Sequence, residues 1–137
     1  MIADRVAAVR DRIARAAARA RRRPEEVLLV AVSKTHHAFA AGLRDFGENK
    51  VQEAEPKVAA LAALRAGGLR WHLVGHLQAN KARAAVSLFD RIHSLDSVRL
   101  GNRVEKAAEE QAKPFPVLVQ VKLGDEETKA GLDEQHL

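Results

Sequence analysis

The sequence predicts an α/β protein in which parallel strands alternate with helices. Short apolar runs rich in Val, Leu and Ile recur along the chain, and Ala-rich amphipathic stretches separate most of them. Unbroken apolar runs of strand length are typical of strands covered on both faces. Their alternation with helices indicates a parallel sheet. An open doubly wound sheet and a barrel both fit this order, and 137 residues are expected to form one domain.

The first predicted element is a helix over residues 2–23. Its apolar side chains recur at spacings of 4, 3 and 4 positions, at Ile2, Val6, Val9 and Ile13. This spacing produces the apolar stripe of an amphipathic helix. Pro24 is expected to end the helix, because proline lacks the backbone donor that a helix interior needs and restricts the residue before it.

Five strand-like runs follow, with helical stretches between most of them. The runs are residues 27–32, 43–47, 69–75, 91–95 and 116–123. The helical stretches are residues 52–65, 80–89 and 97–113. The order is therefore one helix followed by about five βα repeats.

The connection between the first two runs is short. Seven residues separate Thr35 from Leu43, whereas a parallel crossover needs about a dozen or more. Either the two runs are not parallel neighbours or residues are missing after His37. The second alternative is favoured, because residues 39–42 resemble the end of a helix with its Gly cap, without the start of that helix.

Composition excludes several classes of site. The chain has no Cys, which rules out disulfides, thiolate metal sites and cysteine nucleophiles and suits the reducing cytoplasm, where we expect the protein. The N-terminus has no signal-like apolar segment, and no run approaches the ~18 apolar residues of a membrane span. Glycine-rich nucleotide-binding motifs and the GxSxG motif are absent from the sequence.

Lys34 follows the first strand-like run. Alternation places it on the same face as Val30 and Val32. In a barrel a Val-lined face looks inward, so Lys34 would project into the mouth at the C-terminal ends of the strands. Partial desolvation there lowers an ammonium pKa and leaves an amine available for a Schiff base. The alternative is a solvated lysine at a strand end.

Two further strand ends carry polar residues. Phe46-Gly47-Glu48-Asn49 closes the second run with a carboxylate and an amide, which suit either a ligand site or a plain turn. In the third run, His72 and His76 are four residues apart. On a strand they lie ~13 Å apart and cannot share one metal ion. His76 could reach a ligand, whereas His72 is expected to be packed, and His36-His37 is expected to be a polar loop.

The first 23 residues are rich in arginine, and the net charge of the chain is +5. A basic helix could bind a phosphate backbone, so a nucleic-acid-binding module is a third hypothesis. With one Trp, four Phe and no Tyr, the chain offers few side chains for base stacking. A solvated helix face is the better interpretation.

Four segments together resemble one protein family. They are residues 30–35 (VAVSKT), 46–53 (FGENKVQE), 71–81 (WHLVGHLQANK) and 93–97 (HSLDS). In this order they are similar to the pyridoxal phosphate homeostasis proteins, which are PLP-binding relatives of the alanine racemase N-terminal domain. Residues 124–131 resemble the segment after the fifth strand of that family. The match runs through almost all of this chain but covers only the first part of the usual family length.

The resemblance implies a (β/α)8 TIM-type barrel, present here through about the fifth strand and preceded by an N-terminal helix, with residues 1–137 forming one incomplete PLP-binding domain. Lys34 matches the lysine that holds pyridoxal 5′-phosphate as a Schiff base, and Asn49 and His76 match positions near the cofactor. The implied function is PLP homeostasis without turnover. PLP-dependent client enzymes are the implied partners, with no nucleic acid or membrane, and the complete protein is expected to be a monomer.

A PLP-dependent amino-acid racemase is the alternative. It would need a second acid/base group across the cofactor, commonly Tyr, and this chain has none. The family's phosphate-binding segment lies beyond residue 137, so no phosphate ligand is assigned. Five parallel strands cannot close into an eight-stranded barrel. We therefore expect either an open half-barrel with a chain break near His37 or closure by another chain.

Overall fold

The computed structural model describes residues 1–32, 35–124 and 130–133. Its strands are β1 (Val30–Ala31), β2 (Asp45–Glu48), β3 (Arg70–Leu73), β4 (Arg91–Leu95) and β5 (Val117–Val119). Its α-helices are α1 (Ile2–Arg19), α2 (Thr35–Ala40), α3 (Val51–Ala60), α4 (Ala82–Leu88) and α5 (Val98–Glu110). Short 3-10 helices η1 (Pro24–Glu26), η2 (Ala62–Gly67) and η3 (Ala79–Lys81) complete the described elements.

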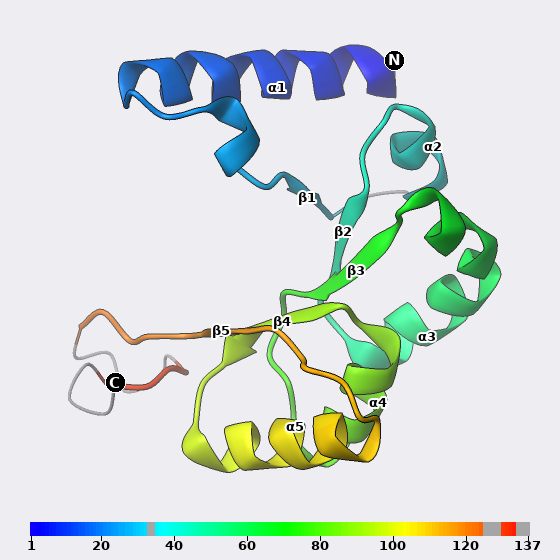
Figure 1. Ribbon diagram of the computed structural model, residues 1–137, viewed down its shortest axis with the longest axis vertical. Coiled ribbons are helices and arrows are strands. Elements are labelled where there is room, and N and C mark those ends of the chain that lie inside the picture. The colour runs from blue at the N-terminus through cyan, green and yellow to red at the C-terminus, as the bar shows by residue number, and fades with distance from the viewer. Residues whose placement is uncertain (33–34, 125–129, 134–137) are drawn as a thin grey trace.

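The five strands form one parallel sheet in the order β1-β2-β3-β4-β5. Helices α2 to α5 follow one another around one side of this sheet, and α1 contacts α2 near the β1 edge (Figure 1). In a doubly wound sheet the strand order reverses and helices cover both faces. Sequential order with helices on one side is the arrangement of a barrel wall, so the structure confirms the partial TIM-type barrel.

The sheet is open, as the strand count predicts. Among the described residues, β1 pairs only with β2 and β5 pairs only with β4 within the sheet. The Val32 and Val119 side chains near these two edges are 60% and 43% exposed. Both edge strands therefore present unpaired backbone groups.

The alternative that the first two runs are not parallel neighbours is wrong, whereas the favoured alternative, that residues are missing after His37, stays a prediction. Strand β1 pairs in parallel with β2, with Val30 opposite Asp45 and Ala31 opposite Phe46. Strand β1 ends one residue earlier than predicted, and β2 begins two residues later. Residues 32–44 are therefore available for the crossover, and this length meets the usual minimum. The chain passes through His37 within α2, so there is no break at that position. The predicted Gly end of this helix is confirmed, because Gly42 has a φ of +85°.

Helix α1 ends four residues earlier than Pro24 would require. The amides of Arg21 and Arg22 donate to the carbonyls of Ala18 and Ala17 at 3.1 and 2.9 Å, which is a Schellman termination. It places Arg21 at a φ of +54°, an uncommon conformation for a residue with a side chain. Backbone capping therefore ends the helix before proline can.

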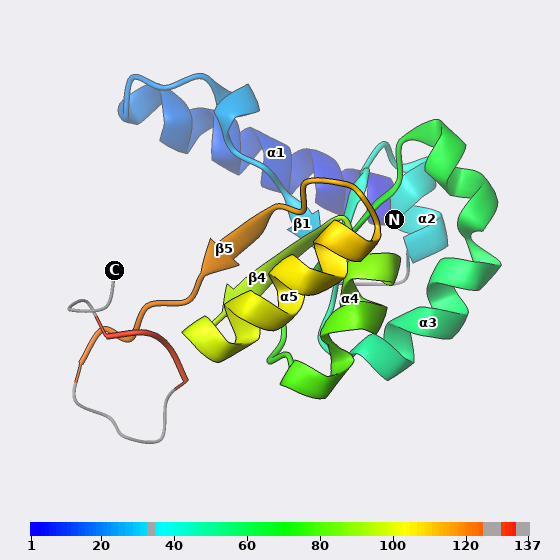
Figure 2. The ribbon, with the colours of Figure 1, turned by 60° about the horizontal axis from the view of Figure 1, so that its bottom comes forward.

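The core lies between the sheet and helices α2 to α5 (Figure 2). Its largest fully buried side chains are Trp71, Phe46, Phe89, Leu73, Ile92 and Val86. Because side chains alternate along a strand, burying Phe46 and Trp71 against the helices turns their neighbours Asp45 and His72 to the opposite face. The packing of the outer face thus sets which polar groups line the inner one.

Candidate functional site

The candidate site lies at the C-terminal ends of β2, β3 and β4. Asn49 follows β2, Gly75 and His76 follow β3, and Asp96 follows β4. The C-terminal ends of neighbouring parallel strands meet at one edge of a sheet, and this is where barrel chemistry occurs. The structure therefore brings the predicted residues Asn49 and His76 to one end of the sheet.

Asn49 is held there by backbone packing against Gly75. A Cβ built on Gly75 would lie 2.2 Å from the Asn49 carbonyl oxygen and 2.8 Å from its Cα. The Val74 amide also donates to the Glu48 carbonyl at 2.9 Å. The Asn49 side chain is exposed and makes no hydrogen bond within the described part of the chain. Its amide remains available to donate to and accept from a ligand.

His76 pairs with a carboxylate from the next strand. Its Nδ1 lies 3.1 Å from Asp96 Oδ2, and the His76 and Asp96 side chains are 63% and 12% exposed. This contact turns the Nδ1 edge of the ring toward Asp96 and leaves Nε2 on the side away from it. His76 also lines two neighbouring hollows of about 340 and 260 Å³.

The end of β1 packs against β2 on the inner face of the sheet, which is the face that carries Asp45 and His72. A Cβ on Gly47 would lie 2.9 Å from Val32 Cγ2 and 3.3 Å from Val30 Cγ1. Val30 and Val32 thus share the inner face with Gly47, as their alternation predicts. Lys34 lies outside the described residues, so its predicted role stays a prediction.

A ladder of polar side chains crosses the inner face. Arg70 donates from Nε and Nη2 to the two Asp45 oxygens, each at 2.7 Å. His72 Nε2 lies 2.9 Å from Asp45 Oδ1, and His72 Nδ1 lies 2.8 Å from His93 Nε2. Asp45 accepts from His72 Nε2, and the His72 and His93 rings share the hydrogen bond between Nδ1 and Nε2. The prediction that His72 is packed with a satisfied ring is confirmed.

Two groups of this ladder have shifted pKa values. Burial alone would raise the pKa of the Asp45 carboxyl, but hydrogen bonds from Arg70 and His72 hold it below its ordinary value. Burial, with added repulsion from His72 and Arg91, lowers the pKa of His93 below its ordinary value. His93 is therefore neutral over a wider pH range than a free imidazole.

We expect acid to destabilise the fold through His93. Because its folded pKa lies below the model-peptide value of 6.5, the unfolded chain binds more protons than the folded chain. The stabilisation is complete above pH 6.5 and is lost as the pH falls through the folded pKa. Urea midpoints measured between pH 8 and pH 5 test this, and His93→Gln should flatten their decline. The exposed His36→Gln variant serves as control, and an equal slope in wild type and His93→Gln would contradict the assignment.

Other predicted features carry no site. His36 and His37 are exposed, as expected, but they lie in α2 rather than in a loop. No group of three or more His, Asp or Glu side chains suited to a metal occurs among the described residues.

Several arginines near α1 have local partners, since Arg15 pairs with Asp11 and Arg10 donates to the Gly42 carbonyl at 2.9 Å. In the part of the chain described, every helix is too short or too polar to cross a membrane.

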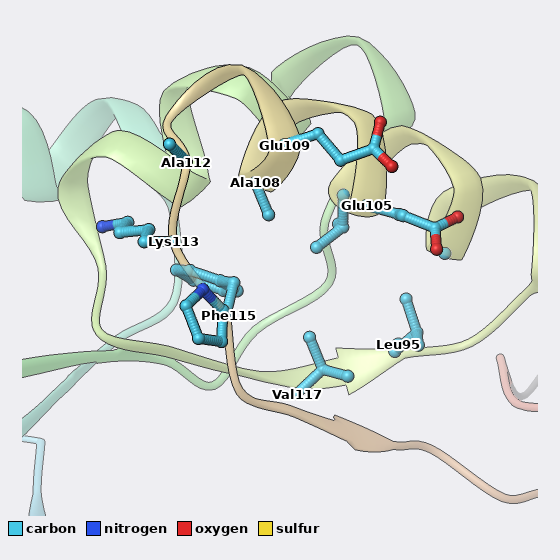
Figure 3. Close-up of a pocket in the computed structure, with 11 residues that line it drawn as sticks. Leu95, Glu105, Ala108, Glu109, Ala112, Lys113, Phe115 and Val117 are labelled. Atoms are coloured by element: carbon cyan, nitrogen blue, oxygen red, sulfur yellow. The ribbon is translucent and has the colours of Figure 1, made fainter.

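A hollow of about 530 Å³ lies between α5 and β5 (Figure 3). Leu95, Ala108, Phe115 and Val117 give it an apolar lining, with Glu105 and Glu109 at its rim. It lies on the helix-covered side of the sheet, and neither Asn49 nor His76 lines it. It therefore belongs to the packing of the barrel wall and not to the candidate site.

Comparison with known proteins identifies the domain. Residues 5–137 match the family model of the alanine racemase N-terminal domain. The pyridoxal phosphate homeostasis protein of Escherichia coli (strain K12) is 42% identical over 137 residues, which cover 96% of this chain and 58% of that protein. The protein of the same name from Pseudomonas aeruginosa is 41% identical over 142 residues, covering 99% and 60%.

Solved structures agree with this. PipY of Synechococcus elongatus without PLP has a TM-score of 0.84 at 44% identity, covering 99% of this chain and 60% of PipY. PipY with PLP bound has a TM-score of 0.79 at 44% identity, covering 97% and 58%. The chain thus spans about three-fifths of the length of these relatives. It belongs to the family of the alanine racemase N-terminal domain, as a relative of the pyridoxal phosphate homeostasis proteins.

Proposed function

We propose that this protein binds pyridoxal 5′-phosphate at the C-terminal ends of its strands and serves PLP homeostasis in the cytoplasm without turnover of its own. Lys34 holds the cofactor as a Schiff base, and Asn49 and His76 contact it. The observation that carries the proposal is the match, at 44% identity over 97% of this chain, to PipY with PLP bound. PLP-dependent enzymes that receive the cofactor are the proposed partners.

The strand ends fit a planar polar cofactor. The Asn49 amide has no partner in the described part of the chain, and His76 presents Nε2 away from Asp96. Gly47 and Gly75 contribute no side chains, so the inner valines and the Asn49 backbone occupy space that a Cβ would fill. Close apolar packing around a few oriented polar groups is typical of small-molecule sites.

Each proposed residue has a distinct role. PLP, when bound, supplies an electrophilic aldehyde, and Lys34 supplies the amine that joins it with release of water. Asn49 orients the cofactor through its amide, and Asp96 holds the Nδ1 side of the His76 ring so that Nε2 faces the cofactor. The valines of β1 exclude water from the side of the site that they cover.

The racemase alternative is less well supported. Racemisation needs two acid/base groups on opposite sides of the cofactor, and the chain has no Tyr. His76 is the one imidazole among the residues proposed to contact the cofactor, and its Nδ1 faces Asp96 at 3.1 Å. The relatives named for PLP homeostasis favour holding the cofactor over catalysis.

A labelling experiment tests the proposal. The purified chain is mixed with PLP, its absorbance spectrum is recorded, and borohydride is added to fix the cofactor on the lysine that holds it. We expect a band at visible wavelengths, followed by a label on Lys34 in the mapped peptides. A label on Lys50 or Lys81, the lysines near His76, would overturn the Lys34 assignment. No band and no label would overturn the proposed function.

A further inference from the structure

The buried side chain of Ser94, on β4, reaches across to the segment that follows β3. Ser94 is 3% exposed, and its Oγ donates to the Gly75 carbonyl at 2.6 Å. The described pairing of β3 with β4 ends at Leu73 and Ile92. The Ser94 hydroxyl therefore holds a piece of chain that lies beyond the paired ends of the strands.

The Gly75 backbone packs directly against the Asn49 backbone, so the Ser94 hydrogen bond also restrains Asn49. The two backbones touch so closely that a Gly75 Cβ would lie 2.2 Å from the Asn49 carbonyl oxygen. Close-packed groups cannot move independently, so a displacement of Gly75 displaces the Asn49 backbone. Ser94, Gly75 and Asn49 thus form one contact chain that spans the ends of three strands.

We infer that Ser94 is a positioning residue for Asn49, acting through the Gly75 carbonyl. The inference rests on the proposed PLP site, to which it adds a residue that touches no cofactor. A buried hydroxyl that serves stability alone needs only a partner for its hydrogen bond. Ser94 instead takes its partner from the backbone segment against which the proposed ligand residue packs. The bond fixes where the Asn49 amide sits when PLP arrives.

PLP titrations of matched serine variants test this role. We expect Ser94→Ala to weaken PLP binding by about tenfold, because a lost buried hydrogen bond leaves the Gly75 carbonyl free to move. Ser94→Thr, which keeps the hydroxyl, should restore most of the affinity. Ser87→Ala is the control, since the Ser87 Oγ bonds the Arg83 carbonyl of its own helix at 3.0 Å. If Ser94→Ala fails to fold, Ser94→Cys replaces it, because a thiol has similar size and is a weak donor.

A double-mutant cycle separates positioning from general stability. If Ser94 acts through Asn49, then Ser94→Ala should cause little further loss of PLP affinity in an Asn49→Ala background. If Ser94 only supports the fold, the loss should be the same in both backgrounds. Equal losses would overturn the inference while leaving the proposed function intact.

A measurement without PLP keeps the two proposals distinguishable. The side-chain amide signals of Asn49 in a ¹H–¹⁵N NMR spectrum should shift in Ser94→Ala and stay in place in Ser87→Ala. An unchanged Asn49 signal in a folded Ser94→Ala protein would contradict the inference, whether or not PLP binds. Absence of PLP binding to the wild-type chain would instead contradict the proposed function.

Discussion

Replacing Lys34 by alanine should abolish the visible absorbance band that PLP gives with the wild-type chain. The proposed site holds the cofactor through the Lys34 amine, the group that condenses with the PLP aldehyde. A lysine side chain contributes little to an apolar core, so the variant should lose no more than about 1 kcal/mol of unfolding free energy. Absorbance spectra with PLP and urea unfolding curves measure the two effects.

Lys50→Ala is the matched control for this variant. Lys50 lies directly after Asn49 but is exposed and pairs with Glu53 at 2.9 Å. Its removal should leave the absorbance band in place. A band that survives in Lys34→Ala and disappears in Lys50→Ala would show that Lys50, and not Lys34, holds the cofactor. Unfolding of Lys34→Ala would show that Lys34 is structural.

The order and type of the elements could be predicted because they depend on local patterns. Apolar runs of strand length occur where the structure has β1 to β5, and amphipathic stretches occur where it has α3, α4 and α5. Helix α2 is not predicted in full, because His36 and His37 are expected to form a loop. Strand boundaries depend on the partner strand, which the pattern does not contain. Residues 27–32 read as one strand, yet only Val30 and Ala31 pair with β2. Together with the later start of β2 at Asp45, this difference makes the crossover longer than the apolar runs predict.

The candidate site likewise combines residues that a local pattern places with partners that only the strand register sets. Asn49 and His76 could be placed at strand ends because each follows an apolar run. Asp96 and Ser94 could not be connected to them, because a cross-strand partner depends on register. The β4–β5 pairing is irregular between Ile92 and Leu95, just where Ser94 lies. Alternation alone could have placed Asp45, His72 and His93 on inner positions, but not within hydrogen-bond distance of one another.

Replacing Gly75 by alanine should have the largest structural effect of any single methyl group added to the site. The new Cβ would lie 2.2 Å from the Asn49 carbonyl oxygen, 2.9 Å from its carbonyl carbon and 2.8 Å from its Cα. These are backbone atoms, so no side-chain rotation relieves the overlap. We expect a loss of about 2–3 kcal/mol in unfolding free energy, the upper part of the range for overpacked sites. PLP affinity should fall as well, because Asn49 must move.

Gly101→Ala provides the matched control, because it adds the same methyl group where there is room. Gly101 lies within α5, and a Cβ there would meet only Leu95 side-chain atoms, at 3.9 and 4.0 Å. Alanine is favoured over glycine inside a helix, so this variant should gain up to about 1 kcal/mol. The two substitutions are thus expected to change stability in opposite directions, which urea midpoints measured side by side can show. A Gly75→Ala protein as stable as wild type, with unchanged PLP affinity, would mean that the position of Asn49 does not depend on its contact with Gly75.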